Sequence, residues 1–180
     1  INRGKHKAEK EYLWMVRSVM EKLVIFHYDM GSRSGSVIES LASQYHFKGY
    51  LQCDGFAGYE TAFKTNPDVR LVNCMAHIRR DFEHALGENK KEAEYGLAQI
   101  QYMYRIEHCC DKAGLSFDGR KAKRRELTRP IMEAMKTWME TEGIKYSPQS
   151  LIGKAVSYAY TRWDNMMRCL KDGRLLLDNN

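Results

Sequence analysis

The chain has 180 residues, of which 43% are hydrophobic and 29% are charged, a composition that suits one domain with a buried core. Its 29 Lys and Arg against 23 Asp and Glu give a net charge of +6, which is compatible with a polyanionic partner but does not require one. No apolar run approaches the roughly 20 residues of a membrane-spanning helix, so we expect no membrane partner.

The start of the chain, INRGKHKAEKEY, has neither an initiator methionine nor the apolar core of a signal peptide, and it suggests a piece of a longer protein. The 5 cysteines are odd in number, and their spacing indicates no disulfide framework. We therefore expect a protein of the reducing cytoplasm.

The first elements are predicted to be two strands, because residues 11–19 (EYLWMVRSV) and 22–28 (KLVIFHY) are rich in β-branched and aromatic residues. They are close together in the sequence and predict an antiparallel hairpin. A helix is predicted over residues 36–45, where Ser36 and Glu39 have the spacing of a capping box.

Two more strands are predicted at residues 48–54 (KGYLQCD) and 69–75 (VRLVNCM), with a helical turn at residues 58–63 between them. A hairpin followed by a strand–helix–strand unit predicts an α/β protein with a mixed sheet and helices packed on it. In such sheets ligand groups gather beyond the carboxyl ends of parallel strands, and Asp54 lies at one such end.

The second half of the chain is predicted to be helical. Helix is expected throughout residues 77–114, a polar and basic interruption at 116–130, and two more helices at 131–143 and 147–173, the last opened by Ser147-Pro148. Several large side chains of this half recur at helical spacing and are predicted to be core rather than a base-stacking surface: Trp138, Tyr158, Trp163 and Met167.

Asp54, in the stretch LQCDGFAGYETAF, has two interpretations. An Asp-Gly pair after an apolar run is a common turn, and this alone explains the residue. Alternatively, Asp54 is a ligand for Mg²⁺, a hard cation that prefers carboxylate oxygens. One carboxylate cannot complete such a site, so two or three would have to converge from different elements.

Cys74 and His77 have CxxH spacing at the predicted junction between a strand and a helix. Zinc needs about four ligands, and no second pair follows at a convincing interval. We therefore predict a structural, packed Cys74/His77 pair rather than a zinc site.

Basic residues in two places are candidates for DNA contacts. Arg79 and Arg80 are predicted in the first turn of a helix, where a positive charge opposes the helix dipole unless it faces phosphates. A solvated basic turn explains them equally well. Residues 119–129 (GRKAKRRELTR) carry six Lys and Arg, which we interpret as a solvated face; DNA binding there would lack sequence preference.

Four stretches together resemble one family: EYLWMVRS, GYLQCDGFAGY, VNCMAHIRRDFEHAL and the terminal LKDGRLLLDNN. Their order and approximate spacing are similar to those of the DDE transposases of the bacterial insertion-sequence family numbered sixty-six. The similarity runs from about residue 11 to the last residue. The Asp-Gly-aromatic-x-Gly-Tyr and Cys-x-x-His-x-Arg-Arg motifs are specific in combination, although each is weak alone.

The resemblance implies an RNase H-like catalytic core with a large all-helical insertion after its last strand. It implies DNA strand cleavage and strand transfer at the ends of a mobile element, with Mg²⁺ or Mn²⁺ held by an Asp-Asp-Glu triad. Asp54 matches the second Asp of that triad. The first Asp is expected before residue 1 and the Glu after Asn180, whereas Asp178 precedes the catalytic helix and is not a triad member.

On this basis we expect a partial RNase H-like core at residues 1–90, a helical insertion at 91–172, and a return to the core at 173–180. The sheet would be incomplete because its first strand is missing. We expect residues 1–180 alone to be inactive, and the full protein to work on DNA as a homo-oligomer. The alternatives are a non-catalytic DNA-binding or accessory helical module, and a helical protein-interaction domain.

Overall fold

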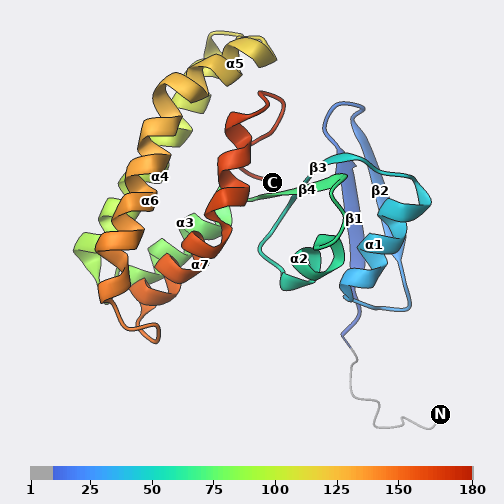
Figure 1. The fold of residues 1–180 in the computed structure, drawn as a ribbon, viewed down its shortest axis with the longest axis horizontal. Helices are drawn as coiled ribbons and strands as arrows, with labels where there is room; N and C mark the ends of the chain where they lie inside the picture. The colour runs from blue at the N-terminus through green and yellow to red at the C-terminus, as the bar shows by residue number, and fades with distance from the viewer. Residues whose placement is uncertain (1–9, 180) are drawn as a thin grey trace, which may run out of the picture. The chain divides into compact units, whose positions relative to one another are not determined.

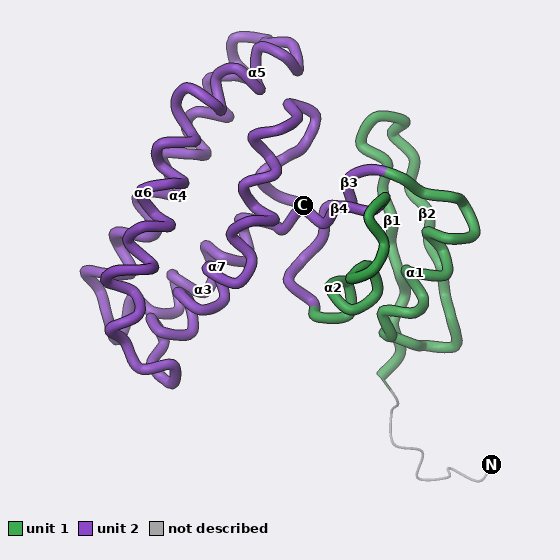
Figure 2. The backbone as a smooth tube through the Cα atoms, viewed as in Figure 1, with its two compact units in different colours: residues 1–48, 57–68 green, residues 49–56, 69–180 purple. Residues whose placement is uncertain are grey.

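The computed structural model describes residues 10–179 of the chain. The chain divides into two compact units, which are coloured separately in Figure 2. Unit 1 consists of residues 1–48 and 57–68, and unit 2 of residues 49–56 and 69–180. Because the chain crosses between them three times, each unit is assembled from separate stretches of sequence.

Unit 1 contains the predicted hairpin and two helices. Strand β1 (Leu13–Ser18) pairs antiparallel with β2 (Leu23–Tyr28), and helices α1 (Gly35–Gln44) and α2 (Ala57–Phe63) pack together. The prediction of a cap at Ser36 is wrong by two residues: the N-cap of α1 is Ser34, whose side chain accepts a hydrogen bond from the backbone amide of residue 36.

The hairpin buries little of its apolar surface. Trp14 is buried, donates a hydrogen bond from Nε1 to the Ser32 carbonyl over 2.9 Å, and meets Tyr59 edge to face. The other large side chains of the two strands are mostly exposed, among them Leu13, Met15, Leu23, Ile25 and Phe26. A two-stranded ribbon has two faces, and one layer of helices covers at most one of them.

Unit 2 contains the second pair of strands. Strand β3 (Gly49–Cys53) runs parallel to β4 (Val69–Asn73), and this parallel pairing brings the carboxyl ends of both strands to the same edge. Within residues 10–179 the two strand pairs form two separate sheets rather than one. The α/β class is therefore confirmed, while the RNase H-like mixed sheet stays a prediction.

Helices make up the rest of unit 2 (Figure 1). The long helices are α3 (Met75–Ala85), α4 (Lys90–Lys112), α6 (Arg129–Thr141) and α7 (Leu151–Met167). Short helical segments connect them: α5 (Phe117–Lys123), the π-helical turn η1 (Arg124–Thr128), and the 3₁₀ turns η2 (Gly143–Lys145) and η3 (Arg168–Leu170). Their buried faces form one core, in which Phe82, Met135 and Trp163 are fully buried.

Three predictions about these helices are corrected. The helix expected throughout 77–114 breaks at residues 86–89, between α3 and α4. The interruption expected at 116–130 is helical, as α5, η1 and the start of α6. Helix α7 begins after Ser150, which caps it by accepting from Gly153, rather than at Ser147-Pro148.

A buried arginine explains why the basic stretch is helical. Arg124 is fully buried and donates from Nε and Nη2 to the two carboxylate oxygens of Glu107 on α4, both over 2.7 Å. Its Nη1 reaches the backbone carbonyls of Cys169, at 3.0 Å, and Asp172, at 3.2 Å. Arg120 donates to the same Glu107 over 2.9 Å. These contacts hold α4, α5, η1 and η3 together.

The chain leaves the sheet and returns to it at the same place. The backbone amide of Met75, at the start of α3, donates to the Leu177 carbonyl over 2.8 Å. The side-chain amide of Gln52 on β3 donates to the Leu176 carbonyl over 2.8 Å and accepts from the Leu176 amide over 3.3 Å. The last described residues therefore lie beside β3 and the carboxyl end of β4.

Candidate functional site at the carboxyl ends of the strands

Asp54 follows β3 directly and is half-buried. Its Oδ1 accepts a hydrogen bond from the Phe56 amide over 3.0 Å, which is the geometry of an Asp-Gly turn. The turn interpretation therefore describes the local backbone. It does not exclude metal binding, because a carboxylate has about four acceptor positions and this hydrogen bond uses one.

Asn73 supports the same turn from the neighbouring strand. It is the last residue of β4, is 3% exposed, and donates from Nδ2 to the Asp54 carbonyl over 3.2 Å. Its Oδ1 is buried and has no hydrogen-bond partner among residues 10–179. A buried amide oxygen without a partner is costly, so it marks a position that favours a donor or a cation.

Helix α7 contacts the turn from the other side. Arg162 donates from Nη2 to the Gly55 carbonyl over 2.8 Å, and its guanidinium lies 3.9 Å from the centre of the Tyr158 ring. Burial raises the pKa of Tyr158; Arg162 and Arg80 act to lower it, and Asp81 and Asp54 to raise it further. Tyr158 was predicted to be core; it is half-buried, packs against the core of unit 2 and also lies beside this turn.

Cys74 is the N-cap of α3, and His77 lies in the first turn of that helix. Cys74 is 1% exposed, and its Sγ lies 3.9 Å from Asp178 Oδ1 and accepts from the Asn179 amide over 3.4 Å. Burial raises the pKa of its thiol, so the unreactive neutral form is favoured. The part of the chain that the structure describes contains no group of three His, Cys, Asp or Glu side chains that could hold a metal.

Asp178 organises this end of the unit, although the sequence pattern did not single it out for any role. Its Oδ1 accepts from the Ala76 amide over 2.9 Å and from the Tyr104 hydroxyl over 2.6 Å. Since Cys74, the N-cap of α3, makes no side-chain cap of its own, Asp178 supplies the cap from a distant part of the chain. Burial and the Asp178 carboxylate strongly raise the pKa of Tyr104.

The two candidate DNA-binding arginines are exposed on α3 and differ in their partners. Arg79 pairs with Glu83 over 2.8 Å within the same helix. Arg80 forms no salt bridge within the described range of the chain. Of the two, Arg80 is therefore the freer to meet a phosphate.

The basic stretch 119–129 is not one solvated face. Arg120 pairs with Glu107 and Asp111, and Arg124 with Glu107. The remaining pairs are made by exposed side chains: Lys123 with Glu126, and Arg129 with Glu133. Much of the charge of this stretch is therefore neutralised within the molecule.

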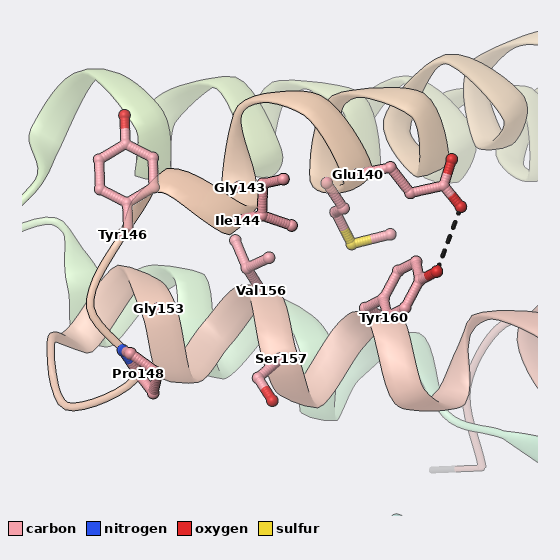
Figure 3. A pocket seen from close by; sticks show the side chains of 10 residues that line it. Glu140, Gly143, Ile144, Tyr146, Pro148, Gly153, Val156, Ser157 and Tyr160 are labelled. Carbon is pink, nitrogen blue, oxygen red and sulfur yellow. Dashed lines mark hydrogen bonds between the residues drawn. The ribbon is translucent and has the colours of Figure 1, made fainter.

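A hollow in unit 2 lies elsewhere, between α6, η2 and α7 (Figure 3). It has a volume of about 570 Å³ and is lined mainly by apolar groups such as Met139, Ile144 and Val156. Glu140 accepts a hydrogen bond from the Tyr160 hydroxyl at its side over 3.3 Å. Because it has no cluster of carboxylates or basic groups, we place the candidate site at Asp54 instead.

No helix within residues 10–179 has the length and apolar character needed to cross a membrane.

The chain is similar to two proteins of Sinorhizobium fredii. It is 28% identical to uncharacterized protein y4qI over 98% of this chain and 34% of that protein, and 30% identical to uncharacterized protein y4hP over 76% of this chain and 28% of that protein. The chain thus spans about a third of these relatives' length. No solved structure matches it.

The family comparison covers the whole chain. Residues 1–180 match the model described as Transposase IS66 family. This agrees with the four stretches identified in the sequence, two of which, around Asp54 and from Cys74 to Arg80, meet at the carboxyl ends of β3 and β4. The chain belongs to the IS66 family of transposases.

Proposed function

We propose that the full-length protein cleaves DNA at the ends of an insertion sequence and joins them to a target, and that Asp54 is one of its catalytic carboxylates. The observation that carries this proposal is the position of Asp54, half-buried at the shared carboxyl edge of two parallel strands. Membership of a transposase family supports the activity and DNA as the partner.

The donor atoms at this edge suit a hard cation such as Mg²⁺ or Mn²⁺. Asp54 offers a carboxylate, and Asn73 offers an amide oxygen that has no partner within residues 10–179. Both are ligand types that Mg²⁺ accepts. When bound, the metal would stabilise the attacking and leaving oxygens of phosphoryl transfer. Two oxygen ligands are too few, so residues outside this chain would complete the set.

The proposal also covers how the chain is divided into a catalytic core and a helical insertion. We propose an RNase H-like core over residues 1–90, a helical insertion over 91–172 and a return to the core over 173–180. The Met75–Leu177 hydrogen bond supports the return, because it joins a residue of the proposed core to the last stretch of the chain. Since only one triad carboxylate is assigned here, residues 1–180 alone would not cleave DNA. The active species would be a homo-oligomer of the full-length protein.

The test is Asp54→Asn in the full-length protein, with Asp118→Asn as a matched control, because Asp118 is exposed on α5. Loss of the charge should lower the single-turnover rate of end cleavage at least about a hundredfold, since a metal contributes several kcal/mol to such a transition state. DNA affinity should change by less than about twofold, because the substitution preserves size. Asp118→Asn should cleave normally.

Two outcomes would contradict the proposal. If Asp54→Asn cleaves at the normal rate, Asp54 is only a turn residue. If the full-length protein binds DNA but never cleaves it with Mg²⁺ or Mn²⁺, the alternative of a non-catalytic DNA-binding or accessory module is supported instead.

A further inference from the structure

The structure assigns a positioning role to Arg162 and Tyr158 of α7: we propose that they hold the Asp54–Gly55 turn so that the Asp54 carboxylate is fixed before a metal binds. This inference rests on the proposed function of Asp54. It gives the helical region a part in the site, beyond its contribution to the fold.

The first observation is the way in which Arg162 bridges α7 and the turn. Its Nη2 donates to the Gly55 carbonyl over 2.8 Å, across 107 residues of sequence. Its Nη1 donates to the Tyr158 carbonyl over 3.2 Å and to Thr161 Oγ1 over 2.9 Å, both on its own helix. A planar guanidinium with both ends engaged has little freedom, so it fixes the position of the carbonyl that it binds.

The second observation is that the turn lies against α7 with no space for a side chain. A Cβ atom at residue 55 would lie 2.2 Å from the Tyr158 hydroxyl oxygen and 2.3 Å from Arg162 Nε, far inside contact distance. A larger residue here would displace the ends of these two side chains, so glycine allows the turn to approach α7 closely. The Tyr158 ring lies under the Arg162 guanidinium and keeps it in place.

The third observation is that the turn is held from both sides. Asn73 of β4 donates to the Asp54 carbonyl, while Arg162 of α7 donates to the carbonyl of the next residue. The Asp54 side chain accepts from the Phe56 amide. With consecutive carbonyls bound by side chains from two different elements, the backbone that carries the carboxylate cannot rotate without breaking a hydrogen bond.

The helix that provides this support is itself firmly anchored. Trp163, the residue after Arg162, is fully buried and donates from Nε1 to the Met132 carbonyl on α6 over 3.1 Å. Ala155 and Ala159, on the same face of α7, are also fully buried. A ligand held by a rigid element loses less freedom when it binds, and supporting residues of this kind commonly contribute 10–100-fold to metal affinity or activity.

The test compares Arg162→Ala with Arg105→Ala in the full-length protein. Arg105 is exposed on α4 and has no place in the proposed site. The measurements are DNA affinity and the single-turnover cleavage rate as a function of Mg²⁺ concentration. We expect Arg162→Ala to lower the rate about 10–100-fold and to raise the half-saturating Mg²⁺ concentration, with DNA affinity within about twofold. Arg105→Ala should leave all three unchanged.

Two conservative variants keep the test valid if Arg162→Ala folds poorly. Arg162→Lys can donate to one carbonyl but not to both sides, so its half-saturating Mg²⁺ concentration should lie between those of the wild type and Arg162→Ala. Gly55→Ala changes the other partner of the same contact and should also raise the half-saturating Mg²⁺ concentration. The double variant Gly55→Ala/Arg162→Ala should raise it by less than the sum of the two single effects, because both substitutions disturb one contact.

The outcomes separate this inference from the proposed function. If Asp54→Asn is inactive while Arg162→Ala and Arg162→Lys cleave with normal Mg²⁺ dependence, the positioning role is wrong and the proposed function stands. A lower rate with an unchanged half-saturating Mg²⁺ concentration would also overturn the inference, because loss of folded protein alone gives that result. If Asp54→Asn cleaves normally, the proposed function itself fails.

Discussion

Asp172 shows how a single residue near the return to the sheet makes stability depend on pH. Its carboxylate accepts hydrogen bonds from the Arg174 guanidinium at 2.6 to 3.2 Å and from the Arg174 amide at 2.9 Å. The Arg174 side chain lowers the pKa of Asp172 to about 2. An unpaired aspartate has a pKa of about 3.9, so protonation is harder in the folded chain than in the unfolded one.

We therefore predict how Asp172 makes the free energy of unfolding depend on pH. A lowered folded pKa adds stability that is complete above about pH 4 and is lost as the pH falls through about 2. The free energy of unfolding of Asp172→Asn should be smaller than that of the wild type at pH 6, and the two should converge near pH 2. Urea unfolding at several pH values checks this. A constant difference across the range would show that the charge of Asp172 is irrelevant.

At the scale of single residues, sequence patterns predict structure that depends on residues close by in the chain. The Asp-Gly turn at Asp54 was predictable because a polar residue and a glycine follow an apolar run directly. The contact of that turn with Arg162 was not, since the partner is 107 residues away. Likewise, nothing local pairs Tyr104 with Asp178, 74 residues later, although their hydrogen bond is among the shortest in the site.

At the scale of elements, the π-helical turn η1 depends on one buried ion pair. Arg124 is 0% exposed and Glu107 has a side chain that is only 12% exposed, so neither charge is well hydrated. The pair joins the turn to α4, while the backbone carbonyls of Cys169 and Asp172 take the remaining guanidinium donor. Its neighbour Arg125 is exposed.

The contrast between buried Arg124 and exposed Arg125 gives a prediction in which Arg125 serves as the control. Arg124→Ala should lower the free energy of unfolding by about 3 kcal/mol, because Glu107 keeps only Arg120 as a partner and the carbonyls of Cys169 and Asp172 lose their donor. Arg125→Ala should change it by less than about 0.5 kcal/mol. Chemical denaturation of the two variants measures the difference. Equal effects would mean that the ion pair contributes nothing beyond surface charge.

The same elements show where sequence prediction stops. Strands β1 to β4 and helices α1 and α6 were predicted to within two residues at each end, because their apolar periodicity is local, whereas α7 is shorter at both ends than the predicted 147–173. The stretch 116–130 was expected to interrupt the helices because it is polar and basic. It is helical because Glu107 and Asp111 of α4 neutralise two of its arginines, and that pairing becomes visible only in the folded chain.

At the scale of the whole molecule, the total of 29 Lys and Arg overstates the number of cations that are available to DNA. Intramolecular pairs neutralise much of the 119–129 stretch. Arg79 is also paired, whereas Arg80 forms no salt bridge within residues 10–179. Non-specific affinity for DNA should therefore depend on the cations outside these pairs rather than on the total number of Lys and Arg.

For the full-length protein we predict that Arg80→Ala weakens DNA binding at all sequences and lowers the slope of log affinity against log salt by about one. Arg79→Ala should have a smaller effect, because Glu83 already offsets its charge. Binding measured across a salt series, with Arg105→Ala as control, distinguishes them. A slope unaffected by Arg80→Ala would place the DNA on another face.

The hydrogen bond between Met75 and Leu177 affects how much the helical region between them can change in length. These two residues close a loop of about a hundred residues, and the entropy cost of closure grows only with the logarithm of loop length. Doubling the region would add only about 0.6 kcal/mol to that cost. Loop-closure entropy therefore sets little limit on the length of the region, whereas specific contacts do: Arg124 of η1 must still reach Glu107, and Arg162 of α7 must still reach Gly55.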